Sequence, residues 1–352
     1  MITLQLFDRL AEGTGSYRMD LTRHARNWAR TIRAVGGFWT GDFEITSTTM
    51  GRLEMVNFYN TAIGQRVAEK TAGITTWEGE IVEMILSLDG VQYKRTLNPN
   101  QFQNKVKVRY PAGVTAYSEK TGSSDVYGES VAIDVVGASY DSTAAAARRD
   151  RILAEKAYPR SRPSGGLSSN AGAEQSETFL SVLCAGYVFS MNRRYQESDV
   201  AATNVSDQIS TLVGNSEFVS AGRIDSNTLS VPVSVEGIPS RLWDLIEEMI
   251  DMGDASGNRW VGGCYAGREF HYEAAETAVS HRWRNGQLVD LGGVPMIPST
   301  IRPNIIVELD GSPAGAVLPG GNVWDNPKRA YIEEVEFMAP NIYRLVPRGG
   351  AS

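Results

Sequence analysis

The chain has 352 residues, of which 42% are hydrophobic and 21% charged, and its formal net charge is −7. This length allows two or three domains, and the composition is ordinary for a soluble globular protein. The negative charge argues against a general affinity for nucleic acid, because phosphate binding is driven by clustered cations. No stretch approaches the roughly 18 apolar residues that a membrane span needs. Residues 1–8 lack the basic and apolar regions of a signal peptide.

The N-terminal part is predicted to consist of short strands separated by turns. Short runs of β-branched and aromatic residues alternate with glycine-rich segments, a pattern typical of antiparallel pairing. A turn is expected at 71–73, and Asp89-Gly90 predicts a hairpin. Strands are expected at residues 2–6, 38–45, 64–69, 77–88, 91–97, 105–110 and 131–135. Large aromatic side chains that could anchor a small barrel or sandwich core are Phe38, Trp39 and Trp77.

Two N-terminal segments have mixed patterns. Apolar residues between 25 and 32 follow helical spacing, so periodicity alone slightly favours a helix over 22–35. The same segment, followed at once by Gly36-Gly37, also fits an irregular strand whose arginines Arg26, Arg30 and Arg33 face outward. The run at 53–63 is mixed and is left without an assignment.

A capped helix and a linker follow the first group of strands. Asp141 is expected to cap a helix that runs through four alanines to about Lys156, and Pro159 stops it. The run 159–173 is rich in proline, glycine and serine and is the best linker in the sequence. We place a domain boundary there.

The part after the linker combines strands with two more helices. A helix is predicted over 204–213, ended by Gly214, and a second from a cap at Ser240 to Met252, ended by Gly253. The β pattern resumes at 178–191, at 229–235, and in short strands and turns over 260–347 that end with 330–337.

The sequence contains no recognisable catalytic or metal-binding motif. It has no GxSxG serine motif, Walker phosphate loop or GxGxxG fingerprint. His271 and His281 lack the spacing of a helical metal pair, and together with His24 they are interpreted as satisfied or surface side chains. Cys184 and Cys264 lack CxxC spacing, so no zinc site is expected, and buried free thiols are favoured over a bridge. We therefore expect no catalytic residue, cofactor site or metal ligand.

Two acidic stretches invite a functional interpretation. Glu78, Glu80 and Glu83 lie close together, and glycoside hydrolysis needs two carboxylates that flank one bond. Strand faces with two glutamates are common in solvent, so we favour a solvated face. The run 251–258 superficially resembles a calcium loop but lacks its ligand spacing and closing glutamate. We interpret it as a loop that ends a helix.

Short patterns rich in glycine and aromatic residues recur along the chain. They include Gly36-Gly37-Phe38 and the segment Trp77-Glu78-Gly79-Glu80-Ile81, and they occupy residues 32–38, 63–67, 77–81, 149–155, 186–187, 260–270 and 331–333. Tail proteins of tailed bacteriophages share a GG-aromatic strand, an LG-x-x-V strand and a WEG-x-I strand. On these motifs the chain resembles that family, and within it a tail-tip or baseplate hub protein.

The resemblance implies a mainly β fold with α+β insertions, built from two or more small β-barrel or sandwich modules. It also favours a strand at 22–35. Together with the linker it predicts five parts: an N-terminal β-barrel-like module at 1–140, the helix and linker at 141–173, a second β-module with a short helix at 174–236, an α/β segment at 237–290, and a C-terminal β segment at 291–352.

The function that the resemblance implies is mechanical, and no enzymatic activity is expected. A hub would form a homo-oligomeric ring in the virion, with a trimer favoured over a hexamer, and join the tail tube to tip, baseplate or fibre proteins. It would need neither specific nucleic-acid binding nor a membrane span. The alternatives are a hexameric distal tail adaptor, a wall hydrolase, or a carbohydrate- or receptor-binding module with a groove lined by Trp39, Trp283 or Trp324.

Overall fold

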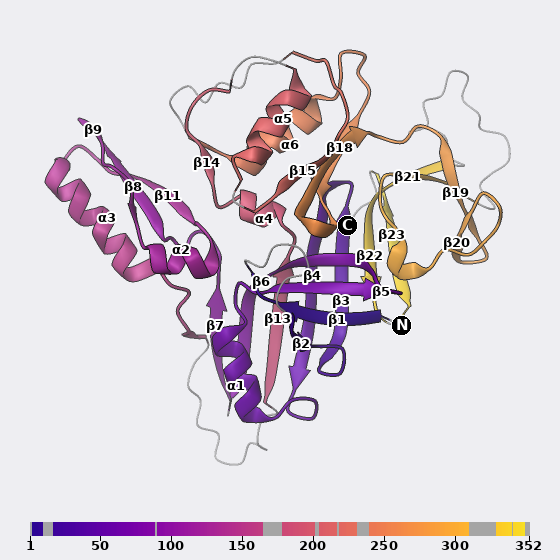
Figure 1. The fold of residues 1–352 in the computed structure, drawn as a ribbon, viewed down its shortest axis with the longest axis horizontal. Helices are drawn as coiled ribbons and strands as arrows, with labels where there is room; N and C mark the ends of the chain where they lie inside the picture. Colours follow the sequence, from indigo (N-terminus) through magenta and orange to yellow (C-terminus); the bar gives the residue numbers. More distant parts are fainter. Residues whose placement is uncertain are drawn as a thin grey trace.

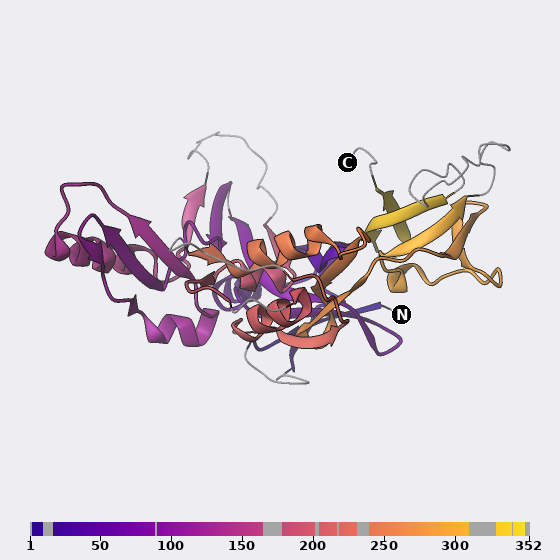
Figure 2. The ribbon, with the colours of Figure 1, turned by 90° about the horizontal axis from the view of Figure 1, so that it is seen from above.

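The protein is mainly β, with few helices, and has an elongated outline. A central sheet carries an α/β unit that projects at one end and a β unit at the other, as Figures 1 and 2 show. The computed structural model describes residues 2–9, 17–88, 90–164, 178–200, 204–216, 218–230, 239–309, 329–339 and 341–348. No helix within these ranges is long and apolar enough to cross a membrane.

The central sheet is antiparallel and combines N-terminal strands with one strand from later in the chain. In it β1 pairs with β2 and β5, β5 with β6, β6 with β7 and β13, β13 with β4, and β4 with β3. Among the described residues neither β1 nor β2 pairs with β3, so the expected barrel does not close. The strands are β1 (Ile2–Phe7), β2 (Tyr17–Asp20), β3 (Ala25–Arg33), β4 (Val35–Thr46), β5 (Arg66–Thr71), β6 (Ile74–Leu88), β7 (Val91–Thr96) and β13 (Phe179–Ala185).

The largest hydrophobic core is enclosed by this sheet and the helix α1 (Arg52–Thr61). Trp28 and Trp77 meet edge to face, with ring centroids 5.4 Å apart. The mixed run at 53–63 is mostly helical because Met55, Phe58 and Tyr59 fall on one face of α1, which is buried against the sheet. Burial of this apolar area is the main favourable term for the central unit.

The α/β unit that projects at one end comprises residues 104–157, and we call it the arm (Figure 1). Asp141 caps its longer helix as predicted, since its carboxylate accepts a hydrogen bond from the backbone N–H of Ala144 at 2.8 Å. Val106 and Val108 alternate inward along the predicted strand. The arm contains β8 (Lys105–Tyr110), β9 (Gly113–Val114), β10 (Ser118–Glu119), α2 (Thr121–Tyr127), β11 (Val131–Val135) and α3 (Ser142–Lys156). After it, β12 (Arg162–Ser164) returns to pair with β7.

A second α/β unit, residues 186–275, packs on the central sheet and has its own hydrophobic core; we call it the α/β layer. It joins the central sheet where β17 runs parallel to the start of β4. Its elements are α4 (Val188–Met191), β14 (Tyr195–Gln196), α5 (Val205–Gly214), β15 (Ser220–Ile224), β16 (Ser240–Arg241), α6 (Leu242–Met252), β17 (Trp260–Cys264), the short 3-10 helix η1 (Ala266–Arg268) and β18 (Glu269–Ala274).

The C-terminal unit is a β structure with a small core of its own. It is attached to the centre through β22, which pairs with β3. Its elements are β19 (Val279–Arg284), β20 (Gln287–Asp290), the 3-10 helix η2 (Pro298–Thr300), β21 (Ile305–Leu309), β22 (Arg329–Met338) and β23 (Ile342–Pro347).

The segment 22–35 forms strand β3, so the helix that periodicity slightly favoured is wrong and the strand is confirmed. Trp28, Arg30 and Ile32 point inward at every second position. Arg30 is therefore inside, not outward as expected, because it pairs with the buried Glu69. A buried arginine at an inward position removes the apolar alternation by which a strand is recognised.

Two other predictions need correction. Ser240 does not cap α6; it pairs with Gln196 in the small β14–β16 ladder, and the helix begins at Leu242 without a side-chain cap.

Strand β13 follows the expected linker, yet it pairs with β4 and β6. The central sheet thus takes in a strand from beyond residue 174, although the five-part division of the chain stays a prediction.

Some predictions fall outside the described residues. These are the linker from 165 to 173, the strand from 231 to 235, Asp89 of the expected hairpin, and Trp324. The strands flanking Asp89 do pair as predicted.

Glycines allow backbones to touch within the central sheet and where the α/β layer meets it. A Cβ atom added to Gly263 would lie 2.1 Å from the backbone N of Gly37, and one added to Gly79 would lie 2.3 Å from the carbonyl O of Ala185. At Gly186 the added atom would lie 1.6 Å from the carbonyl O of Phe38. No side chain fits at these distances, so glycine is required by close approach rather than by turn geometry.

We expect Gly186→Ala to lower the free energy of unfolding by about 3 kcal/mol or more, because either Phe38 or β13 must move. Gly137→Ala is the matched control, since a Cβ atom there has no neighbour within 4 Å, and it should change stability by less than about 1 kcal/mol. Urea unfolding followed by tryptophan fluorescence measures both. Equal losses in the two variants would contradict the close-approach argument.

Candidate functional site

The two glutamates considered for hydrolysis lie on one face of β6, as predicted, but this face is not solvated. Glu78 and Glu80 are 5% and 2% exposed, because the α/β layer and the N-terminal strand cover them. Glu83, further along β6, is half-buried and pairs with Lys94 at 2.6 Å. The interpretation as a solvated face is therefore wrong for Glu78 and Glu80, since a single strand cannot reveal what packs on it.

Glu80 is held by two buried arginines. One carboxylate oxygen accepts a hydrogen bond from Arg9 Nε at 3.0 Å, and the other accepts one from Arg193 Nη2 at 2.6 Å. Arg9 follows β1, whereas Arg193 belongs to the α/β layer. The pair of charge-assisted bonds thus joins β6 to two segments that are remote in sequence.

Glu69, on β5, also joins its strand to distant segments by hydrogen bonds, on the opposite face of the sheet. It is fully buried, and its carboxylate accepts hydrogen bonds from Arg30 Nε at 2.7 Å and Trp28 Nε1 at 2.6 Å. Thr76 Oγ1 also donates to it. Arg30 in turn donates from Nη2 to the carbonyl O of Ser299 at 2.6 Å, which ties the C-terminal unit to this cluster.

Glu78 differs because its partners are backbone groups. One of its oxygens accepts the N–H groups of Gly267 at 2.7 Å and Arg268 at 3.2 Å, both in η1 of the α/β layer. Burial raises the pKa of Glu78 above its ordinary value, and the Arg66 guanidinium and the two backbone donors only partly oppose this effect. The donors around Glu78 thus offset only part of the cost of burying its charge.

This arrangement gives the carboxylates a structural role. Each of the three glutamates accepts hydrogen bonds from a segment distant in sequence, so each carboxylate already has partners. A glycosidase needs one carboxylic acid and one carboxylate that reach a sugar from opposite sides. Neither Glu78 nor Glu80 lines any of the three grooves described below.

Each of the three histidines has a polar neighbour within the protein. His24 Nδ1 lies 2.6 Å from the carbonyl O of Thr49, His281 Nδ1 lies 2.9 Å from Ser280 Oγ, and His271 lies 3.5 Å from Glu269. Across the described ranges no three His, Cys, Asp or Glu side chains are grouped so that they could hold a metal ion.

The loop at 251–258 ends α6, as interpreted. Its Asp254 carboxylate accepts hydrogen bonds from the side chain and backbone N–H of Asn258, both at 2.9 Å, and from the backbone N–H of Ser256 at 2.8 Å. These bonds lower the pKa of Asp254 to about 2. The carboxylate thus closes the loop on itself.

Two of the three tryptophans proposed to line a sugar-binding groove, Trp39 and Trp283, pack within the protein instead. Trp39 lies against Phe189, with ring centroids 5.2 Å apart, and Arg33 stacks over it. Trp283 packs edge to face on Tyr343 at 6.0 Å. Neither residue lines one of the three grooves.

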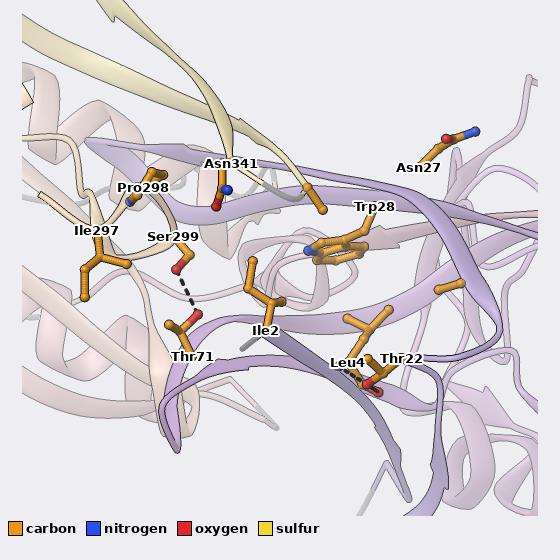
Figure 3. Close-up of a pocket in the computed structure, with 12 residues that line it drawn as sticks. Ile2, Leu4, Thr22, Asn27, Trp28, Thr71, Ile297, Pro298, Ser299 and Asn341 are labelled. Atoms are coloured by element: carbon orange, nitrogen blue, oxygen red, sulfur yellow. Dashed lines mark hydrogen bonds between the residues drawn. The ribbon is translucent and has the colours of Figure 1, made fainter. Parts of the chain in front are cut away.

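Three of the grooves formed by the described residues are large enough to consider. An apolar groove of about 480 Å³ occupies the gap between β1 and β3, and Figure 3 shows Leu4 and Trp28 along it. At one end Thr71 and Ser299 are joined by a hydrogen bond of 2.8 Å. A polar groove of about 650 Å³ lies between the end of α6 and Glu333 of β22. A third, of about 390 Å³, lies between β7, β13 and α4.

The apolar groove has an exposed aliphatic rim. Ile297 lines the groove, Ile74 pairs with the lining residue Thr71, and Met338 pairs with Ile342 next to the lining residues Ala339 and Asn341. The exposed fractions of the four rim side chains run from 54% to 67%. Exposed apolar side chains near a groove are a feature of protein–protein contact sites. The rim consists of Ile74, Ile297, Met338 and Ile342.

Comparison with known proteins gives a weak structural likeness. No protein-family model and no curated protein sequence matches the chain. Among solved structures, the 43 kDa tail protein of prophage MuSo2 from Shewanella oneidensis is similar, with a TM-score of 0.41 and 8% sequence identity. The match covers 98% of this chain and 95% of that one.

We expect Glu80→Gln to lower the free energy of unfolding by about 3–5 kcal/mol, because it removes the buried negative charge that Arg9 and Arg193 bind. Glu78→Gln is the matched substitution on the same strand face. It should change stability by no more than about 1 kcal/mol near neutral pH, because an amide oxygen can accept the two backbone bonds without the cost of burying a charge. Urea unfolding of both variants tests this contrast.

The pH dependence of these variants gives a second readout. Because folding raises the pKa of Glu78, its contribution to stability is full below the unfolded value and is lost as the pH rises through the folded value. Glu78→Gln should therefore become more stable relative to the parent as the pH rises from about 4 to about 7. A difference that stays constant across this range would contradict the raised pKa.

Both cysteines are buried and free, as favoured from the sequence. Burial raises the pKa of the Cys184 and Cys264 thiols, so the reactive thiolate is scarce. We expect a disulfide-exchange reagent to label neither thiol in the folded protein within the time that labels both in urea. Rapid labelling of one cysteine under native conditions would show that its surroundings open.

Proposed function

We propose that this protein is a structural component of a bacteriophage tail, a hub protein that forms a ring at the tail tip or baseplate. There it would join the tail tube to tip or fibre proteins, and its role would be mechanical. A trimer is favoured over a hexamer. The assignment to the tail proteins rests on the sequence resemblance.

The observation that carries the proposal is that motifs shared with tail proteins meet at one place in the fold. Glu78 of the WEG-x-I strand binds η1, which lies in the glycine-rich segment 260–270. Gly37 of the GG-aromatic strand faces Gly263 of that same segment, and Gly186 faces Phe38. Patterns scattered along the sequence thus form one junction, which supports a common scaffold rather than chance similarity.

The distribution of exposed apolar side chains supports an assembly role. The groove between β1 and β3 and its rim lie away from this junction, on a surface shared by the central sheet and the C-terminal unit. We expect this surface to be covered by a neighbouring copy in the ring. A ring interface of an obligate assembly commonly buries more than roughly 2,000 Å². The groove and rim would form only part of such an interface, so further surface would also have to be buried.

The alternatives differ in what they predict. A distal tail adaptor would be a hexamer. A carbohydrate- or receptor-binding module needs exposed aromatic side chains along a groove, whereas Trp39 and Trp283 pack against other aromatic rings. A wall hydrolase needs two carboxylates that reach its substrate, whereas Glu78 and Glu80 bind partners within the protein.

The mass of the purified full chain tests the ring. Mass photometry should give three times the mass of one protomer, and electron microscopy of native particles should place the chain at the tail tip. Ile342→Asp should shift the mass towards the protomer without lowering the melting temperature. Leu53→Asp, at an isolated and 83% exposed position on α1, is the control and should leave the mass unchanged. A stable protomer that cleaves cell wall or binds glycans would overturn the proposal.

A further inference from the structure

The arm folds around its own small core. Val106 of β8 packs with Ile152 and Leu153 of α3, and with Ala132 and Ala157, in a cluster separate from the main core. The extensive packing contacts of its strands and helices are all with one another. The arm is therefore a local unit whose internal packing does not require the central sheet.

The arm is attached to the rest of the protein at its base. Tyr127, at the end of α2, packs edge to face on Phe102 of the main core, with ring centroids 5.8 Å apart. The backbone of Arg193 accepts the N–H of Val131 at 2.9 Å, and its side chain donates to the carbonyl O of Tyr127 at 3.1 Å. Two chain segments, 97–103 and 158–161, lead into and out of this base.

Farther out, the contact between the arm and the α/β layer is polar. The outer face of the arm sheet, opposite α3, meets the chain that runs from Arg194 to Glu197. Lys107 of β8 and the hydroxyl of Tyr117 both donate to the Glu197 carboxylate. Arg194 pairs with Glu129 of the arm at 2.9 Å. We call the contacts of Glu197 and Arg194 with the arm the latch.

The latch is partly open to solvent, unlike the junction of the central sheet. The side chains of Glu197 and Arg194 are 39% and 23% exposed, against 3% for Glu80. Ion pairs with this exposure are weakened by salt, whereas buried pairs are screened much less. The contacts that set the angle of the arm are thus weaker and more sensitive to salt than those that hold the rest of the fold.

We propose that the arm is a hinged unit, which turns about the Tyr127–Phe102 base and is held in the observed position by the latch. Release of the latch frees the arm as a rigid body while its own core stays intact. The proposal goes beyond the ring: it assigns the arm as the part of the protomer that changes direction, and it holds whether or not the chain forms a ring.

The charged and titratable groups around Glu197 come from both sides of the contact. Lys105, Lys107 and Tyr117 act on it from the arm. Glu129 and Tyr195 are near Tyr117, and Arg194 pairs with Glu129. Burial would raise the pKa of Glu197, but the hydrogen bonds from Lys107 and Tyr117 outweigh it and lower the pKa. The Glu197 contacts of the latch are therefore complete at neutral pH and are lost as the pH falls through this lowered value.

Paired spin labels on the full chain test the hinge. Val135→Cys lies on the arm and is 71% exposed, and Leu53→Cys lies on α1 of the central unit and is 83% exposed. The two native thiols are buried, so labels attach to the introduced cysteines. An excess of unlabelled chain removes distances between protomers. Pulsed dipolar spectroscopy then gives the distribution of distances between arm and centre.

We expect one narrow distance distribution in dilute buffer at neutral pH. Glu197→Gln should broaden or shift it, and so should about 1 M salt, where the screening length falls to about 3 Å. The matched control is Glu54→Gln, an exposed glutamate of α1, which should leave the distribution unchanged. Hydrogen exchange should show β8 and β11 equally protected in all variants.

Two results would overturn the proposal. If neither Glu197→Gln nor salt changes the distances, the base alone fixes the arm and no latch exists. If the distances change but β8 and β11 also lose protection from exchange, the arm unfolds instead of turning. Neither result would bear on the ring, which is tested separately by the mass of the assembly.

Discussion

Three buried glutamates on the β5–β6 hairpin fix how the units of this protein are placed. Removing a carboxylate from water costs several kcal/mol, and this cost is offset only where several donors converge on it. Glu80 meets Arg9 and Arg193, Glu69 meets Arg30 and Trp28, and Glu78 meets η1. A unit that packed at another angle would leave a buried charge uncompensated, so the ion pairs specify one arrangement.

The glycines act at the same junction by a different mechanism. Close contact between β17 and the start of β4 is possible only because Gly37 and Gly263 carry no side chain. Backbone contact brings the α/β layer near enough for η1 to donate its N–H groups to Glu78. The steric and electrostatic requirements therefore depend on one another, because a displaced layer would also leave Glu78 without its donors.

Much of the local structure could be read from the sequence, because local signals determine it. The strand at 105–110 alternates apolar and charged residues, and the helix that begins after Asp141 has a cap that accepts a backbone N–H. The errors arise where the burial of a side chain depends on a segment that is distant in the sequence. Arg30 looked like a surface residue because nothing near it in sequence reveals Glu69.

The same reason explains what was missed at the candidate site. Glu78 and Glu80 were correctly placed on one strand face, but their burial depends on Arg9, Arg193 and η1, which no strand pattern contains. The glycine of the WEG-x-I motif does mark close approach of another backbone, since a Cβ atom on Gly79 would meet the carbonyl O of Ala185. Because strand residues alternate between faces, that contact lies on the face opposite Glu78 and Glu80 and does not reveal that the glutamates are covered.

The fold uses charge in two ways that differ in strength and in response to conditions. At the central junction each carboxylate is buried and, in the case of Glu80, bound from two sides, so salt has little access to it. At the arm, Glu197 is partly exposed and depends on one lysine and one tyrosine. Electrostatic interactions therefore make the centre rigid and leave the arm adjustable, and this difference follows from burial: a glutamate carboxylate is the acceptor in both places, but only at the centre is it shielded from solvent.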